Sequence, residues 1–202
     1  MDTTELIKFI AFNNWLDYTI AIYLGSFIVQ LFFYIFIFSR LAFFKPKALQ
    51  EAIEPISVVI CAKNERDNLL DFLPLYLNQQ YSKFEIIVVN DNSVDDTSDV
   101  LRAFSLQYND LKIVNVPDTD RFYGSKKFAL TLGIKAAQYN NVLLTDADCK
   151  PASKHWIKLM SQYSNKKTIV LGFGAYERKK GLLNKLIRFE TFYTALQYLS
   201  FA

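Results

Sequence analysis

The longest apolar stretch of the sequence, Tyr18–Phe38, contains no charged residue. At about 1.5 Å of rise per residue, a helix of this length crosses a bilayer core of about 30 Å. The pattern therefore predicts a transmembrane helix over 18–38, after an N-terminal flank over 1–17. A cleaved signal peptide is disfavoured, because the apolar run is too long and no small-residue cleavage site follows it. A buried core helix of a soluble protein is rarely so long and so uniformly apolar.

Three basic residues, Arg40, Lys45 and Lys47, follow this helix closely. By the positive-inside rule, the C-terminal end of the helix faces the cytosol. We therefore predict a protein held in the membrane by one N-terminal anchor, with a linker over 39–54 and a cytoplasmic domain beyond it. Cys61 and Cys149 fit a reducing compartment and do not have the spacing of metal ligands.

Beyond the linker, the pattern changes to short apolar runs rich in β-branched residues. The runs are continuous rather than alternating, which is typical of strands covered on both faces, and the segments between them are long enough for crossover helices. This pattern predicts an α/β domain over 55–175 with an open, mostly parallel sheet flanked by helices. The five predicted strands are 56–61, 84–90, 111–116, 141–146 and 168–173.

The last segment, 176–202, repeats apolar residues at helical spacing and carries basic residues before and within the repeat. A basic amphipathic helix in a membrane-anchored protein is typical of an interfacial helix on an anionic leaflet, and equally of a helix that packs on its own domain. Because the apolar pattern continues to the last residue without a stop signal, we expect the natural protein to extend further. The basic residues are Arg178, Lys179, Lys180, Lys185 and Arg188.

Composition narrows the class of protein. A chain of 202 residues holds one domain with a sizeable core and an appendage. The formal net charge of +3 is too mild for a dedicated nucleic-acid binder, and a content of 51% hydrophobic residues argues against disorder.

Polar clusters follow three of the predicted strands. "AKNERD" comes after the first strand, "DNSVDDT" after the second and "DADCKP" after the fourth. In open parallel sheets, ligands bind outside the carboxyl ends of the strands, where these clusters would meet. Taken singly, Asn64 and Asp95 can cap helices, and acidic loop residues are usually solvated. The joint placement favours one functional edge.

The chemistry of these clusters suits a cation and an anionic ligand. The glycines form neither G-x-G-x-x-G nor a P-loop, and no G-x-S-x-G is present. Asp146 and Asp148 suit Mg²⁺ or Mn²⁺, and on an extended segment alternate residues point the same way. "GSKKFALTLGIKAA" predicts a helix with Lys126 and Lys127 in its first turn, where ammonium and free N–H groups meet anionic oxygens. Together these features suit a nucleoside diphosphate as leaving group.

Four segments carry a family resemblance: "PISVVICAKNE", "FEIIVVNDNSVDDT", "GSKKFALTLGI" and "LLTDADCKP". In this order and spacing, over roughly Pro55–Gly174, they resemble the family 2 inverting glycosyltransferases, nucleotide-sugar-dependent enzymes with the GT-A fold. The resemblance implies a nucleoside-diphosphate sugar as donor, with a UDP-sugar favoured, a divalent cation, Mg²⁺ or Mn²⁺, as cofactor, a lipid or glycan acceptor at the membrane, and no nucleic acid.

The resemblance also implies site residues. It implies that Asp91 contacts the base, that Asp146 approaches the ribose and the sugar diphosphate, and that Asp148 binds the metal together with Asp146. Lys63 departs from the family, because an aromatic residue is common at its position. The implied nucleotide-sugar-binding residues are Ala62, Asn64, Glu65, Asp91, Lys126 and Asp146.

The family's acceptor-activating aspartate, which lies well beyond D-x-D, has no match in this sequence, and neither does the Q-x-x-R-W of processive members. The catalytic residue is therefore unassigned, and we expect these residues to form a donor-binding portion that is inactive by itself. Two other readings stay open. One is a nucleotidyltransferase that makes sugar nucleotides, although "CAKNERDN" lacks the usual glycine-rich loop. The other is a non-catalytic, membrane-tethered nucleotide-binding scaffold.

Overall fold

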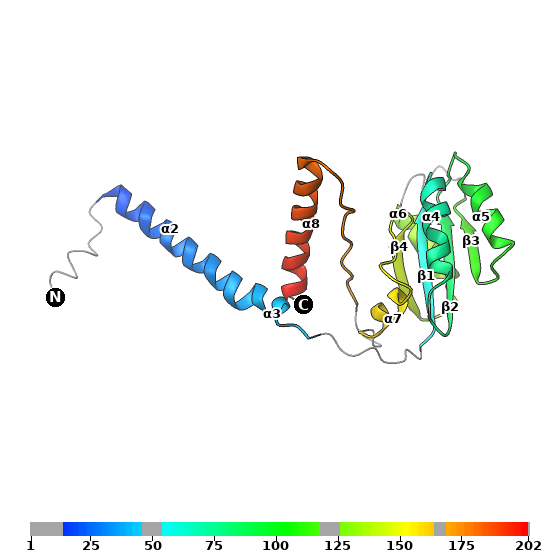
Figure 1. The fold of residues 1–202 in the computed structure, drawn as a ribbon, viewed down its shortest axis with the longest axis horizontal. Helices are drawn as coiled ribbons and strands as arrows, with labels where there is room; N and C mark the ends of the chain where they lie inside the picture. Colours follow the sequence, from blue (N-terminus) through cyan, green and yellow to red (C-terminus); the bar gives the residue numbers. More distant parts are fainter. Residues whose placement is uncertain (1–13, 46–53, 118–125, 164–168, 202) are drawn as a thin grey trace. The chain divides into compact units, whose positions relative to one another are not determined.

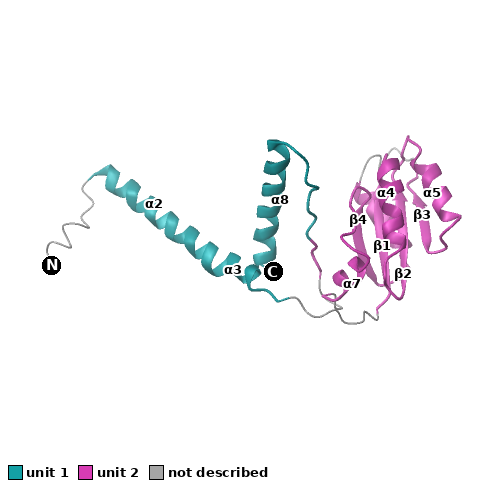
Figure 2. Ribbon diagram, in the orientation of Figure 1, with its two compact units in different colours: residues 1–47, 173–202 teal, residues 48–172 magenta. Residues whose placement is uncertain are grey.

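The computed structural model describes residues 14–45, 54–117, 126–163 and 169–201 (Figure 1). The chain divides into two compact units, one formed by residues 1–47 and 173–202 and the other by residues 48–172 (Figure 2). The first is called the helical unit and the second the sheet unit, and each is described by itself.

The described residues of the sheet unit form four parallel strands in the order β3-β2-β1-β4. This arrangement confirms the prediction of an α/β fold with an open parallel sheet. Because β1 lies between β2 and β4, the strand order reverses beside it, and such a switch point is where α/β sheets bind ligands. The strands are β1 (Ile56–Ala62), β2 (Phe84–Asn90), β3 (Leu111–Asn115) and β4 (Asn141–Asp146).

Helices cover both faces of this sheet, as the continuous apolar strands predict (Figure 1). Successive side chains of a strand point to opposite faces, so Val58 and Ile60 join one core while Val59 joins the other. The first core is completed by α4 (Arg66–Leu77), α5 (Thr97–Ser105) and α7 (Trp156–Ser161), and the second by α6 (Lys126–Ala136).

Gly133 lets α6 lie close against the sheet. A Cβ at this position would stand 2.5 Å from Val59 Cγ1 and 2.7 Å from Val89 Cγ2, closer than real Cβ contacts allow. Both valines are fully buried, so they have little room to move away. The missing side chain therefore sets the distance of α6, which begins at Lys126, from the strands.

The predicted strand at 168–173 is wrong for the residues that the structure describes, because 169–173 form no strand. The side chain of Ile169 is 90% exposed. The β-branched residues of the segment 168–173 favour an extended backbone. A strand also needs a neighbour to complete its hydrogen-bond ladder, and 169–173 have none in the described part of the chain.

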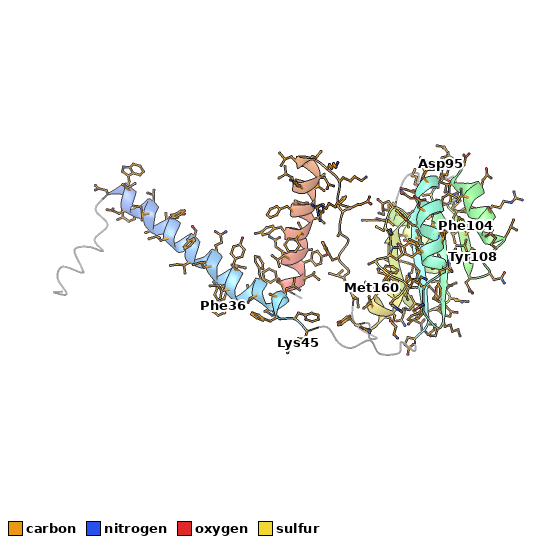
Figure 3. The ribbon with its side chains drawn as sticks, in the orientation of Figure 1. Phe36, Lys45, Asp95, Phe104, Tyr108 and Met160 are labelled. Carbon is orange, nitrogen blue, oxygen red and sulfur yellow. The ribbon has the colours of Figure 1, made fainter. Side chains whose placement is uncertain are left out.

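The helical unit contains α2 (Trp15–Phe32), a π-helical turn η1 (Phe33–Phe38) and α3 (Ser39–Ala42), which together run without a break. Trp15–Ala42 is long and apolar enough to cross a membrane, and none of its most apolar window is buried. The side chain of Phe36, for example, is exposed (Figure 3). This helix covers the predicted span 18–38 and fits a membrane anchor.

The second long helix of this unit is α8 (Leu182–Phe201), which packs on η1 and α3. The rings of Phe38 and Tyr193 meet edge to face with centroids 6.4 Å apart. Arg40 Nη1 donates a hydrogen bond to the Ser200 carbonyl over 3.4 Å. The end of α8 is therefore held where the long apolar helix ends.

Candidate functional site

The carboxyl ends of β1, β2 and β4 bring the predicted residues to one edge of the sheet. Cys61 of β1 is in register with Asp146 of β4, and Ala62 with Asn90 of β2. The ladder continues one residue past the strands, since Asp91 N donates to the Ala62 carbonyl (2.9 Å) and Ala147 N to the Cys61 carbonyl (3.2 Å). The backbones that carry Asp91 and Asp146 are therefore fixed on either side of β1.

Hydrogen bonds join the loop after β1 to the loop after β2. Asn64 and Asn92 both have left-handed backbones, with φ of 56° and 50°, a conformation that asparagine adopts more readily than most residues. Asn64 N donates to Ser93 Oγ (2.9 Å), and Asn64 Oδ1 accepts from Val94 N (2.8 Å). The Asn64 side chain thus holds the two loops together rather than capping a helix.

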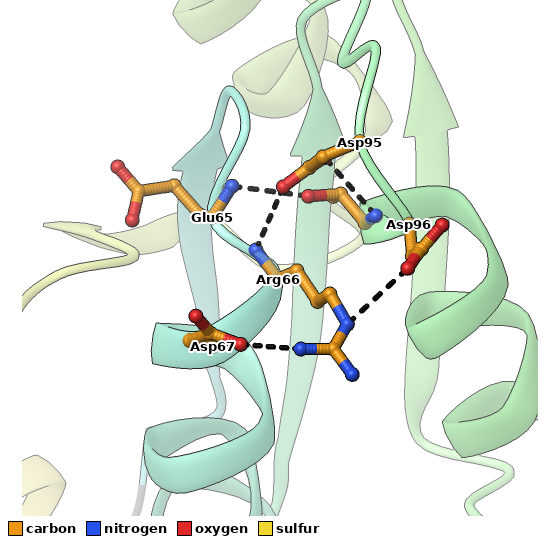
Figure 4. Close-up of polar contacts among 6 residues, drawn as sticks. Glu65, Arg66, Asp67, Asp95 and Asp96 are labelled. Atoms are coloured by element: carbon orange, nitrogen blue, oxygen red, sulfur yellow. Dashed lines mark hydrogen bonds and ion pairs between the residues drawn. The ribbon is translucent and has the colours of Figure 1, made fainter.

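The loop after β2 also caps the start of α4, the helix that follows the loop after β1 (Figure 4). Glu65 N donates to Thr97 Oγ1 over 3.0 Å, and Arg66 N donates to Asp95 Oδ2 over 3.3 Å. Asp95 Oδ1 accepts from Thr97 N at the start of α5 (3.1 Å). Hydrogen bonds, first of all from the Thr97 side chain, hold the pKa of the Asp95 carboxyl below its usual value. Asp95 is therefore a structural cap shared by α4 and α5.

Side chains of α4 complete this connection. The Arg66 guanidinium lies 2.5 Å from Asp67 Oδ1 and 3.5 Å from Asp96 Oδ2, so it links α4 to the loop after β2 (Figure 4). The carboxylate of Glu65, the residue just before α4, accepts a hydrogen bond from Asn68 Nδ2 of that helix over 2.6 Å. Glu65, a predicted nucleotide-binding residue, contributes both its N–H and its carboxylate to these local contacts.

Asp91 is the most buried carboxylate of the edge. Its side chain is 10% exposed, and Lys63 Nζ lies 3.8 Å from Asp91 Oδ2. The lysine side chain is 43% exposed, so the ion pair lies at the boundary between the protein core and the solvent. A carboxylate held in this way can accept hydrogen bonds from a ligand that approaches from outside the strands.

Lys126 and Asp146 form an ion pair on the other side of β1. Lys126 Nζ lies 2.8 Å from Asp146 Oδ1 and 2.9 Å from Oδ2, so it contacts both carboxylate oxygens. The hydrogen bond to Asp146 is the largest cause that raises the pKa of Lys126 above its usual value. Through this pair, the start of α6 meets the end of β4.

Asp148 stands on a turn rather than on an extended strand, which corrects the geometry assumed for D-x-D. β4 ends at Asp146, and Cys149 N donates to the Asp146 carbonyl over 3.1 Å to close the turn. The exposed Asp148 accepts a hydrogen bond from Cys149 Sγ over 3.5 Å. Burial is the largest cause that raises the pKa of this thiol. The two aspartates are neighbours through a turn, and strand alternation does not align them.

Tyr76 is a residue of this region that sequence reasoning missed. It is buried in α4, and its hydroxyl donates to the Cys149 carbonyl (2.9 Å) and pairs with Thr145 Oγ1 (3.2 Å). Burial is the largest cause that raises the pKa of Tyr76 to about 12. The spacing of Leu69, Leu73 and Tyr76 marks a helical core face, but nothing in that spacing reveals that the hydroxyl supports the turn carrying Asp148.

The oxygen ligands at the end of β4 fit a divalent cation that is shared with a substrate. Within the described ranges, no three His, Cys, Asp or Glu side chains gather so as to hold a metal ion by themselves. Mg²⁺ binds through one or two carboxylates and takes its remaining ligands from water and substrate phosphates. Asp146 and Asp148 match this donor set.

The structure brings the predicted residues together in pairs. Asp146 meets Lys126, while Asp91 meets Lys63, which was noted only as a departure from the family. Ala62 is buried, and its carbonyl oxygen accepts the hydrogen bond from Asp91 N. All of the following lie at the carboxyl edge of the sheet: Ala62, Asn64, Glu65, Asp91, Lys126, Asp146 and Asp148.

The chain is similar in sequence to known bacterial glycosyltransferases and polysaccharide synthases. The chain is 36% identical over 125 residues to the poly-beta-1,6-N-acetyl-D-glucosamine synthase of Staphylococcus epidermidis, which covers 60% of the chain and 29% of that protein. It is 33% identical over 141 residues to the probable glycosyltransferase YdaM of Bacillus subtilis (strain 168), covering 67% of the chain and 33% of that protein. The chain therefore spans about a third or less of the length of these curated relatives.

A solved structure shares the fold. The mannosyltransferase PcManGT from Pyrobaculum calidifontis, in complex with GDP-Man and Mn2+, matches with a TM-score of 0.60 and 24% identity, over 74% of this chain and 44% of that one. Residues 57–200 match the family described as glycosyl transferase family 2. The chain belongs to glycosyl transferase family 2, and its sheet unit has the GT-A type of fold.

Proposed function

We propose that the carboxyl edge of the sheet binds a nucleoside-diphosphate sugar, with a UDP-sugar favoured, together with Mg²⁺ or Mn²⁺. In the whole protein, the sugar passes to a lipid or glycan acceptor with inversion at the anomeric carbon. The observation that carries this proposal is the meeting of Asp91, Lys126 and Asp146, which come from three separate segments, at one edge. The proposed donor-binding domain is 55–175.

Asp91 and Lys63 are suited to the nucleoside. The largely buried Asp91 carboxylate accepts hydrogen bonds from N–H groups of a base, while the Lys63 ammonium donates to a carbonyl or ring nitrogen beside them. The loops that carry these residues are joined through Asn64 and Ser93, so the base meets a surface that is already ordered. Little ordering of the protein then has to accompany binding of the nucleoside.

Lys126, Asp146 and Asp148 are suited to the diphosphate. Asp146 and Asp148 would hold the divalent cation, and Lys126 stands where its ammonium can donate to phosphate oxygens. The bound cation supplies neutralisation of the charge that develops on the diphosphate leaving group. The PcManGT complex with GDP-Man and Mn2+ supports this assignment at the level of the shared fold.

The acceptor side is proposed for the whole protein. Inversion requires an acceptor hydroxyl to attack opposite the leaving diphosphate, with a base to take its proton. For these 202 residues we propose donor binding without robust transfer, because the sequence has no match to the family's acceptor-activating aspartate. The name of the S. epidermidis relative describes synthesis of a polysaccharide, which supports a glycan acceptor.

The helical unit is proposed to hold the enzyme at a membrane, with the sheet unit in the cytosol. Arg40 lies in the last turn of the apolar helix and Lys45 follows the helix, as the positive-inside rule requires, while Lys47 lies outside the described residues. On α8 the apolar side chains of Leu182 and Leu186 are exposed, and the basic Lys185 lies between them in the sequence; exposed apolar and basic residues together support an interfacial position for this helix. Protease digestion of sealed, inside-out membrane vesicles tests the orientation, because a cytosolic sheet unit is digested in them.

Calorimetry of the chain in detergent tests the donor site. UDP, GDP and ADP are titrated with and without Mn²⁺, and Asp148→Ala serves as the matched variant. We expect one diphosphate to bind in a metal-dependent way and to lose that dependence in the variant. If the folded protein bound none of the three, the proposed donor site would be wrong for this chain.

A further inference from the structure

The Lys126 ammonium contacts both carboxylate oxygens of Asp146. In the proposed function, Asp146 is also a ligand of the cation. The ammonium lies 2.8 and 2.9 Å from the two oxygens, and the lysine side chain is 70% exposed. A cation at Asp146 needs at least one of these oxygens as a ligand. The ammonium and the cation therefore compete for one carboxylate.

The charges at this corner predict how the competition resolves. Two carboxylates and one ammonium leave a single negative charge among Lys126, Asp146 and Asp148, and a divalent cation turns this sum into a single positive charge. The displaced ammonium then lies beside a divalent cation of the same sign, which is unfavourable. A diphosphate restores the balance and offers the ammonium new acceptor oxygens.

We propose that Lys126 exchanges partners, from Asp146 to the donor diphosphate, and thereby makes binding of the cation and of the diphosphate mutually dependent. The proposal rests on the proposed function and deepens it, since it assigns the dependence to one side chain. Lys126 weakens the binding of a cation that arrives alone and strengthens the binding of the diphosphate that follows. By linkage, the diphosphate then raises the affinity for the cation by the same factor.

Lys127 provides a matched control. It is the next residue of α6, is exposed, and carries the same charge. Within the described part of the chain, its ammonium makes no ion pair, whereas that of Lys126 does. Lys126→Met and Lys127→Met therefore remove the same charge from the same turn, and one of them also removes the ion pair with Asp146.

The experiment measures Mn²⁺ and UDP separately on the full 202-residue chain in detergent. Free Mn²⁺ is followed by its paramagnetic resonance signal, and UDP binding at saturating Mn²⁺ is followed by calorimetry. For Lys126→Met, we expect Mn²⁺ without nucleotide to bind about threefold to fivefold more tightly, as expected from loss of an exposed ion pair. UDP at saturating Mn²⁺ should bind about tenfold more weakly, because a charge-assisted hydrogen bond is lost.

Lysine acetylation followed by mass spectrometry gives a second readout on the unaltered chain. Reactivity of Lys126 should rise when Mn²⁺ alone is added and fall when Mn²⁺ and UDP are both present, while Lys127 serves as the internal reference. Lys126→Gln is a second variant in case Lys126→Met does not fold, which near-ultraviolet circular dichroism would reveal.

Two results would overturn the exchange. One is equal Mn²⁺ affinity of Lys126→Met and Lys127→Met in the absence of nucleotide, which includes the case that neither binds Mn²⁺. The other is tighter Mn²⁺ binding without any loss of UDP affinity. Failure of the proposed function looks different, since the unaltered chain would then bind none of the nucleotides while the Mn²⁺ comparison could still be read.

Discussion

The two sides of the proposed donor site, a nucleoside side and a diphosphate side, differ in how firmly they are built. On the nucleoside side, the loops after β1 and β2 are joined by hydrogen bonds through Asn64, Ser93 and Asp95, and the side chain of Asp91 is 10% exposed. On the diphosphate side, Lys126 and Asp146 are 70% and 48% exposed and hold each other by one ion pair. Exposed ion pairs contribute at most about 1 kcal/mol, so the second side is the more easily rearranged.

This difference indicates a division of roles. An ordered surface binds a rigid base with little loss of conformational freedom. The open side is suited to a cation and a diphosphate, which bring strong charges of their own and can reorganise the side chains around them. The following changes test the comparison, from the largest expected effect to the smallest.

Asp148→Ala should abolish the contribution of the cation and leave the nucleoside side intact. We expect the affinity for the nucleoside diphosphate in Mn²⁺ to fall about 100-fold, because a metal ligand is lost. Without metal, the affinity should not change. Calorimetry checks both values, and Asp71→Ala, which removes an exposed carboxylate from α4, is the control. An equal loss in the absence of metal would contradict the division of roles.

Gly133→Ala should disturb the diphosphate side from beneath. The added Cβ would meet two buried valines at 2.5 and 2.7 Å, so α6 must move away from the sheet and take Lys126 with it. Overpacking costs about 1–3 kcal/mol, from which the gain of alanine over glycine in a helix, about 0.5–1 kcal/mol, is subtracted. Unfolding in denaturant should show a net loss.

Thr131→Ala is the control for this change, because it alters the exposed face of the same helix. It should leave stability nearly unchanged. A Gly133→Ala protein of normal stability would show that α6 is free to shift at no cost, and the role given to the close approach of α6 would then be wrong.

Tyr76→Phe should loosen the turn that carries Asp148. The change leaves the ring in place but removes the donor to the Cys149 carbonyl, which should lower the free energy of unfolding by about 1 kcal/mol. Mn²⁺ binding should weaken while metal-free nucleotide binding stays constant. Tyr108→Phe is the control, since this half-buried hydroxyl makes no hydrogen bond among the described residues. If Tyr76→Phe and Tyr108→Phe had equal effects on stability and on Mn²⁺ binding, the role given to the Tyr76 hydroxyl in supporting the Asp148 turn would be wrong.

Asp95→Asn should produce a small, pH-dependent loss of stability on the nucleoside side. The native pKa of Asp95 lies below its usual value, so the ionised carboxylate stabilises the fold above the unfolded pKa of about 3.9. That stabilisation is lost as pH falls through the native pKa. At pH 7 the variant should melt slightly lower, and once the pH lies below the native pKa of Asp95 the two proteins should melt together. A difference that persists in acid would exclude the carboxylate as its source.

Much of the fold could be predicted from the sequence because its strands are continuous apolar runs. The predicted strand 56–61 became Ile56–Ala62, and 84–90 and 141–146 have the predicted bounds. The run 168–173 has the same composition and yet 169–173 form no strand, since composition does not supply a pairing partner. Pairing is a property of the whole sheet, which no single segment shows.

The site was predictable in its location and less so in its geometry. The clusters at the strand ends placed Asp91 and Asp146 at one edge, because parallel strands deliver their carboxyl ends together, whereas Lys126 came from a predicted helix start. The turn at Asp148 and the hydroxyl of Tyr76 were not predictable, since each depends on contacts between segments far apart in the sequence. The spacing of D-x-D alone is the same in a strand and in a turn.

The strand order also fixes a sequence of events during synthesis. Among the strands that the structure describes, β1 leaves the ribosome first and its neighbour β4 last, so β1 keeps one unpaired edge until residues 141–146 emerge. The nucleoside side can close once β2 and the loop after it are made, whereas the Lys126–Asp146 pair waits for β4. While β1 waits for β4, its open strand edge is a route to aggregation of the nascent chain.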